Sequence, residues 1–193
     1  RILASGKSIP ISGIGLSTDD LDKVLDLTSR PHGLFLICGP TGSGKTTTLH
    51  AILSNLNTSD KKIWTAEDPV EITQPGLRQV PINEKLGLSF SKAIRAFLRA
   101  DPDIVMIGEI RDEETADIAI QASLTGHLVL STLHTNSAVE TIVRLLEIGM
   151  DEFNFADALR GVLSQRLVKT LCASCKVPYL PEQNDLQMLA KDY

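Results

Sequence analysis

The feature that most constrains the fold of this chain is a glycine-rich loop directly after a short apolar run. The run, residues 34–38, reads Leu-Phe-Leu-Ile-Cys and has the length of a buried parallel strand. The loop, residues 39–46, matches G-x-x-x-x-G-K-[ST] at every fixed position, and a helical pattern runs from Lys45 to about Asn55. Strand, loop and helix in this order predict a site for nucleotide phosphates rather than an ordinary glycine turn.

The residue types in this loop explain how it would hold phosphate. Glycines adopt backbone angles that other residues avoid, so successive N–H groups can turn toward one anion, and the start of the helix adds further donors. Lys45 is expected to reach the β- and γ-phosphates, and the Thr46 hydroxyl to ligate Mg²⁺. The predicted ATP-binding residues are Gly39, Pro40, Thr41, Gly42, Ser43, Gly44, Lys45, Thr46 and Thr47.

Strand and helix patterns alternate along the rest of the chain. Further strands are expected at 62–66, 104–107 and 127–132, and helices after the caps Ser17 and Ser89 and at 113–124, 138–146 and 156–168. The segment 74–87 is rich in turn residues, and a short hairpin is expected there. This alternation predicts an α/β fold with a mostly parallel sheet flanked by helices, and ligands at the carboxyl ends of the strands.

Acidic residues follow two of the expected strands. Glu109 comes one residue later than the aspartate that is usual beside a phosphate loop. It is predicted to act on Mg²⁺ through a water or to orient the attacking water, and a solvated carboxylate is the alternative. Glu67, Asp68 and Glu71 follow the strand at 62–66 on the same rim. Carboxylates gathered there favour a bound cation, which Mg²⁺–ATP would supply, although they could also cap a turn.

Two histidines and an arginine near the strand ends are further candidates. His134, after the strand at 127–132, is placed to hydrogen-bond a γ-phosphate, whereas His127 is expected on the opposite rim. Zinc binding by this pair is disfavoured because a seven-residue separation across a strand keeps the two rings apart. Arg111, two residues after Glu109, is the best candidate for an arginine presented at a subunit boundary, although a solvated side chain is the common alternative.

Composition narrows the classes of function. The chain has 193 residues, enough for one well-buried domain, and a net charge of −5, which disfavours nucleic acid as the main partner. No apolar run approaches the roughly 20 residues that span a bilayer, so no membrane span is expected. We expect residues 1–16 to be a linker from a missing amino-terminal domain, 17–170 the nucleotide-binding domain, and 171–193 the start of a truncated metal-binding subdomain.

The cysteines point to a reducing environment and half of a metal site. Cys172 and Cys175 form a Cys-x-x-Cys pair, whereas a tetrahedral zinc site needs two more ligands. Two free thiols are therefore expected in this chain, and zinc only in a longer protein. Cys38 lies in an apolar run and is expected to be a small core residue. Three cysteines without a disulfide framework fit a cytoplasmic protein.

Four segments in this order resemble the ATPases of type II secretion systems and the related motors of type IV pilus assembly. They are the loop at 39–46, the acidic segment 65–71, Gly-Glu-Ile-Arg-Asp at 108–112, and the stretch 125–136. The likeness runs from about Leu16 to Cys175, nearly the whole chain. The third segment is typical of this family in ending its strand with Gly-Glu, which accounts for the late position of Glu109.

The resemblance implies a RecA-like P-loop ATPase domain that works as a homohexamer at the cytoplasmic face of the inner membrane. There, Glu109 would orient the attacking water with help from Glu67 and His134, and hydrolysis would drive secretion or pilus assembly through membrane platform proteins. Fuller members carry two zinc-binding Cys-x-x-Cys pairs, which retraction motors usually lack. Two other hypotheses remain open: a nucleotide-gated interaction module, and a nucleic-acid-translocating relative of the same fold.

Overall fold

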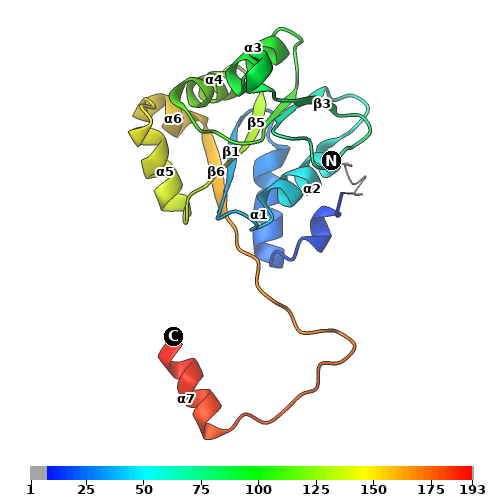
Figure 1. Ribbon diagram of the computed structural model, residues 1–193, viewed down its shortest axis with the longest axis vertical. Coiled ribbons are helices and arrows are strands. Elements are labelled where there is room, and N and C mark those ends of the chain that lie inside the picture. Colours follow the sequence, from blue (N-terminus) through cyan, green and yellow to red (C-terminus); the bar gives the residue numbers. More distant parts are fainter. Residues whose placement is uncertain (1–7, 193) are drawn as a thin grey trace.

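The computed structural model describes residues 8–192 and contains a six-stranded sheet in which every pair of neighbours is parallel (Figure 1). The strand order is β3-β2-β4-β5-β1-β6. The strands are β1 (Gly33–Cys38), β2 (Ile63–Glu67), β3 (Arg78–Pro81), β4 (Ile104–Ile107), β5 (Leu128–Leu133) and β6 (Leu159–Ser164). The expected α/β fold with a parallel sheet is therefore confirmed.

Helices cover both faces of the sheet (Figure 1). α1 (Thr18–Ser29) and α2 (Lys45–Leu56) lie on one face; α3 (Phe90–Leu98), α4 (Glu113–Leu124), α5 (Ala138–Glu147) and α6 (Glu152–Ala158) lie on the other. Because side chains alternate along a strand, β1 contributes to two separate apolar clusters. Phe35 and Ile37 pack on the side of α2, whereas Leu34 and Leu36 pack on the side of α4.

Side-chain caps set the start of most of these helices. The Ser17 hydroxyl accepts from the N–H of Asp20, and the Ser89 hydroxyl accepts from the N–H of Lys92, so both predicted caps are confirmed. The α2 helix is different. Its first residue is preceded by Gly44, which has a positive φ of 86° and offers no side chain to the helix. The unpaired N–H groups at the start of α2 therefore stay available to an anion.

The sequence-based prediction is wrong in two segments. No hairpin forms between residues 74 and 87; instead β3 pairs in parallel with β2, and a single antiparallel bridge joins Asn83 to Leu88. The predicted helix at 156–168 is α6 followed by β6, which pairs with β1. Gly161 disfavours a helix there, and an unpaired edge on the buried β1 would leave N–H and C=O groups without partners. Tertiary pairing therefore decides this segment.

The two ends of the described chain differ. Ile11, in the short helix η1 (Ile11–Gly13), and Leu16 pack against the α1–α2 cluster, so this part of the expected linker lies on the domain. Residues 1–7 of that linker fall outside the described range. After β6 the chain leaves the domain as an exposed arm that ends in α7 (Gln183–Asp192) (Figure 1). Among residues 8–192, no helix is long and apolar enough to cross a membrane.

Candidate active site

The strand order brings four predicted segments to one edge of the sheet. β5 lies between β1 and β4, and β2 lies on the far side of β4. All these strands are parallel, so the loop after β1, His134 after β5, Glu109 after β4 and Glu67 at the end of β2 share one rim. The topology thus places His134 between the glycine loop and Glu109.

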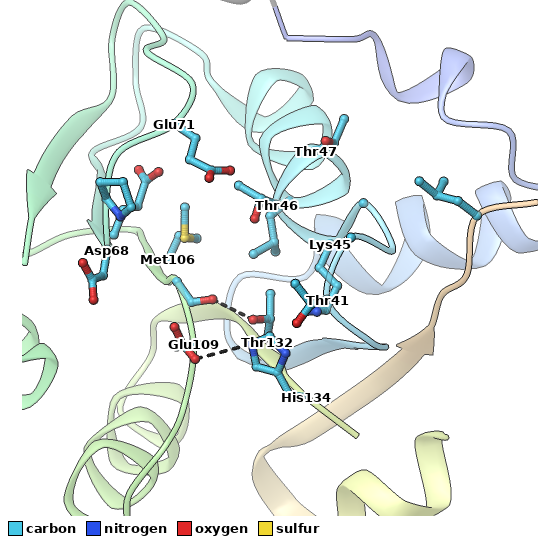
Figure 2. A pocket seen from close by; sticks show the side chains of 17 residues that line it. Thr41, Lys45, Thr46, Thr47, Asp68, Glu71, Met106, Glu109, Thr132 and His134 are labelled. Carbon is cyan, nitrogen blue, oxygen red and sulfur yellow. Dashed lines mark hydrogen bonds and ion pairs between the residues drawn. The ribbon is translucent and has the colours of Figure 1, made fainter. Parts of the chain in front are cut away.

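A cavity of about 470 Å³ opens at this rim. Figure 2 shows the labelled Lys45, Thr46 and Thr41 on the α2 side, Asp68 and Glu71 across from them, and Glu109 with His134 at one end. Its lining residues are Thr41, Gly42, Gly44, Lys45, Thr46, Thr47, Leu49, Glu67, Asp68, Pro69, Glu71, Met106, Gly108, Glu109, Thr132, His134 and Leu167. Most of the predicted ATP-binding residues and three of the four predicted catalytic residues therefore line one space.

The glycine loop is shaped for an anion. Gly42 and Gly44 have φ values of 80° and 86°, a region that side chains rarely tolerate, and a Cβ on Gly42 would meet only open space. Among the described residues, Ser43 Oγ is the buried side-chain atom without a hydrogen-bond partner. A buried hydroxyl without a partner is costly, and Ser43 itself does not line the cavity. The room that the loop offers to an anion is therefore at Gly42.

Lys45 is held inside this loop. Its Nζ donates to the carbonyl oxygens of Gly39 at 2.8 Å and Pro40 at 3.0 Å. An ammonium has three donors, so one remains for a phosphate oxygen. Burial lowers the pKa of the Lys45 ammonium, and the nearby Glu109 carboxylate acts in the opposite direction. Negative charge in the cavity would likewise favour the charged form of Lys45.

The position of Glu109 has a steric explanation. Gly108 continues β4 by donating its N–H to the carbonyl of Ala66 at 2.8 Å, and a Cβ on Gly108 would lie 3.2 Å from that oxygen. Because a side chain at position 108 would press on β2, the acidic residue lies one position later, at 109. Glu109 is held at both oxygens: Arg111 Nη2 donates to Oε1 at 2.6 Å, and His134 Nε2 lies 3.5 Å from Oε2.

Glu67 has a different environment from Glu109. Only 3% of its surface is exposed, and three side chains donate to its carboxylate. Thr65 Oγ1 and Gln79 Nε2 donate to Oε1 at 2.6 and 3.0 Å, and His50 Nε2 lies 3.1 Å from Oε2. Gln74 completes the group, because its Nε2 donates to the His50 carbonyl at 2.8 Å and faces His50 Nδ1 at 2.9 Å.

The hydrogen bonds around Glu67 define its ionisation. An amide nitrogen can only donate, so His50 Nδ1 accepts from Gln74, and the ring proton lies on Nε2, where it donates to Glu67. Burial acts to raise the pKa of Glu67, but the hydrogen bonds from His50, Thr65 and Gln79 outweigh it and lower the pKa. Glu67 is therefore a buried, ionised carboxylate that joins α2 to β2 and β3.

The remaining predicted groups lie at different distances from the cavity. Arg111 is half-exposed, and its hydrogen bond to Glu109 raises the pKa of the guanidinium. It lines an adjoining hollow beside α5, which shares Glu109 and His134 with the main cavity. His127 lies at the amino end of β5, as expected, and its Nδ1 donates to the Ala122 carbonyl at the end of α4.

The cysteine pair lies far along the arm. Cys172 and Cys175 are both exposed and unbridged, and Cys38 is buried as predicted. A hydrogen bond from the Ser174 backbone, together with others from Cys175, lowers the pKa of the Cys172 thiol. Between residues 8 and 192, no group of three or more His, Cys, Asp or Glu side chains is arranged to hold a metal ion.

Several residues near the loop were missed by the sequence reasoning. They are His50, Gln74 and Gln79 around Glu67, and Thr48 and Gln165 behind the glycine loop. Gln165 comes from the segment predicted to be helical, and His50 lies on a helix face with no distinctive spacing. A buried polar residue on an otherwise apolar helix face was the one available signal, because such a group needs a partner.

Comparisons with known proteins show which family the chain matches. Residues 1–192 match the family described as Type II/IV secretion system protein. The chain is 50% identical over 190 residues to the type IV pilus assembly ATPase PilB of Thermus thermophilus, and 52% identical over 171 residues to the type II secretion system ATPase E of Vibrio cholerae. These matches cover 98% and 89% of this chain but 21% and 34% of the relatives. The chain thus spans about a third or less of their length.

Solved structures show the same fold. The pilus retraction motor PilT with bound ADP superposes with a TM-score of 0.75 and 39% identity, covering 84% of this chain and 49% of that one. The ATPase DotB of Legionella pneumophila gives a TM-score of 0.73 and 32% identity, covering 84% of this chain and 47% of its own. The expected RecA-like fold is thereby confirmed. By sequence match, fold and the grouping of its four segments, the chain belongs to the type II/IV secretion system protein family.

Proposed function

We propose that this chain is the nucleotide-hydrolysing part of a motor ATPase. The observation that carries the proposal is that the glycine loop, Glu109 and His134 line one cavity. A phosphate held at the loop would thus have a carboxylate and an imidazole nearby. The relatives named as ATPases, and the ADP bound to the PilT motor, support ATP as the nucleotide.

Each residue has a distinct role in this proposal. Lys45 and the N–H groups of the loop bind the β- and γ-phosphates, and the Thr46 hydroxyl ligates Mg²⁺, which would neutralise charge on the phosphates. Glu109 orients the attacking water, and His134 contacts the γ-phosphate. Glu67, which also lines the cavity, assists by holding α2 and β2 in place. Arg111 serves at a subunit boundary, where its half-exposed side chain is accessible.

The motor would work as a homohexamer at the cytoplasmic face of the inner membrane, with platform proteins of a secretion or pilus machine as partners. The names of the relatives support both type II protein secretion and type IV pilus assembly. Residues 1–16 would link to an amino-terminal domain. In the longer protein a second cysteine pair would join Cys172 and Cys175 around zinc, which their exposed position on the arm permits.

The decisive experiment measures Mg²⁺-dependent ATP hydrolysis by the full-length protein and by Lys45→Ala. We expect Lys45→Ala to lose nucleotide binding. Among the residues that line the cavity, Lys45 is the one lysine or arginine, so the variant has no ammonium for the phosphates. Lys176→Ala, on the exposed arm, is the control. Unchanged ATP binding and turnover in Lys45→Ala would overturn the proposal.

A second candidate is a nucleotide-gated interaction module in which turnover is incidental. It is favoured by the contacts of Glu109, because one carboxylate oxygen accepts from Arg111 and the other lies 3.5 Å from His134 Nε2. Hydrolysis by the full-length hexamer with and without its membrane partner separates the two. Stimulation by the partner supports the motor, whereas slow turnover that the partner does not alter supports the module.

A further inference from the structure

The segment that follows β6 makes an unusual set of contacts with the glycine loop. Gln165 is its central residue and is half-buried, and its side chain contacts Ser43 and Thr48, which lie 122 and 117 residues away along the chain. We propose that Gln165 is a positioning residue that holds the phosphate-binding loop in its binding conformation. The inference rests on the proposed function, since it assigns a part in nucleotide binding to a residue that does not line the cavity.

Three hydrogen bonds attach Gln165 to the loop and to the strand and helix on either side of it. Its backbone N–H donates to the Cys38 carbonyl at 2.8 Å, where the loop begins. Its side-chain Nε2 donates to the Ser43 carbonyl at 2.7 Å, in the middle of the loop. Its Oε1 accepts from Thr48 Oγ1 at 2.8 Å, on the first turns of α2. The end of β1, the middle of the loop and the start of α2 are thus tied to one residue.

Steric contact adds to these hydrogen bonds. A Cβ on Gly39 would overlap the Gln165 carbonyl oxygen, and a Cβ on Gly44 would lie 2.9 Å from Gln165 Nε2. Both positions also have a positive φ. Two of the three loop glycines therefore accommodate Gln165 as well as the backbone turn.

This attachment has a consequence for binding. A loop with three glycines has many accessible conformations, and only those with converging N–H groups bind phosphate. Hydrogen bonds that hold this conformation before the ligand arrives reduce the entropy lost on binding. Removing them should weaken nucleotide affinity while leaving the groups that perform the chemistry in place.

The neighbouring residues connect the same segment to the other side of the cavity. Ser164 Oγ and Arg166 Nη2 both donate to the carbonyl of Asn136, two residues after His134. Residues 164–166 therefore join the phosphate loop to the loop that carries His134, and the chain then continues into the exposed arm.

The test uses the full-length protein and compares Gln165→Met with Gln121→Met. Methionine has nearly the shape of glutamine but can neither donate to Ser43 nor replace the acceptor for Thr48. Gln121 lies exposed on α4, where its Nε2 donates to Asp117, and serves as the matched control. The measurements are the dissociation constant of a non-hydrolysable ATP analogue, KM and kcat for ATP, and the melting temperature.

We expect Gln165→Met to raise the dissociation constant and KM by about tenfold, as for the loss of one to two hydrogen bonds, with kcat within about threefold of wild type. Gln121→Met should match wild type in the dissociation constant, KM and kcat. Thr48→Val removes the hydrogen bond between Thr48 and Gln165 by deleting its donor. The double variant should therefore bind the analogue no more weakly than Gln165→Met alone.

Unchanged analogue affinity in a folded Gln165→Met would overturn the inference. If Gln165→Met does not fold, Thr48→Val decides: wild-type affinity overturns the inference, and a several-fold loss supports it. Failure of the proposed function is distinguishable, because the wild-type protein would then bind the analogue without hydrolysing ATP, or would not bind it at all.

Discussion

Glu67 and Glu109 occupy similar positions, at the carboxyl ends of neighbouring parallel strands, and have opposite surroundings. Glu67 is 3% exposed and accepts hydrogen bonds from three side chains that are themselves fixed. The Glu109 side chain is 17% exposed, and its two partners, Arg111 and His134, are half-exposed. A carboxylate with fixed, buried donors holds the fold together, whereas one with exposed partners can exchange them for water or ligand.

The largest expected effect is on turnover in Glu109→Gln. The amide cannot accept a proton from water, so we expect hydrolysis by the full-length protein to fall by about 10²-fold or more while ATP binding persists. The melting temperature should change little, because the Glu109 partners are exposed. Glu114→Gln, on the surface of α4, is the control. Wild-type turnover in Glu109→Gln would contradict the catalytic role of Glu109 that separates it from the structural Glu67.

The next effect is on stability in Glu67→Gln. Thr65, Gln79 and His50 all donate hydrogen bonds to the Glu67 carboxylate. The glutamine amide turns a donor toward one of them, so that buried polar group loses its acceptor. We expect a loss of about 1–3 kcal/mol in the free energy of unfolding. Trp64, the one tryptophan of the chain, lies in β2 and reports unfolding by fluorescence. Glu71→Gln, exposed on the same rim, should unfold like wild type.

The pH dependence of stability should come partly from Glu67. Its pKa is lower in the folded chain than in the unfolded one, so the unfolded chain binds more protons in acid. The stabilisation is complete above the ordinary glutamate pKa of about 4.3 and is lost as the pH falls through the folded pKa. Denaturation at a series of pH values should therefore show the wild-type chain approaching Glu67→Gln in acid. A constant difference between them would contradict this.

The smallest expected effect on stability is that of Arg111→Ala. An ion pair with a half-exposed guanidinium contributes less than about 1 kcal/mol, so the unfolding midpoint should stay close to wild type. Arg95→Ala is the control, because Arg95 is as exposed as Arg111 and also pairs with a glutamate, Glu114. Loss of turnover in assembled Arg111→Ala, absent from Arg95→Ala, would support a role at a subunit boundary. A large loss of stability would show that the Glu109 environment is as fixed as that of Glu67.

The sequence alone determined the phosphate loop, the parallel α/β fold and the rim on which Glu67, Glu109 and His134 lie. These depend on local signals: apolar runs of strand length, caps such as Ser17 and Ser89, and a loop whose residue types and spacing carry their own chemistry. Each of these signals involves only a few neighbouring residues, so it can be recognised without knowing the distant contacts.

Tertiary structure decided β3, β6 and the surroundings of each site residue. β6 forms because β1 has an edge to pair, although the apolar pattern of the segment predicts a helix and only Gly161 argues against one. His50, Gln79 and Gln165 acquire their roles from partners up to 122 residues away. Glu67 and Glu109 look alike in the sequence. Packing alone buries Glu67 among its donors and leaves Glu109 accessible, because burial and hydrogen-bond partners come from segments that meet only in the folded chain.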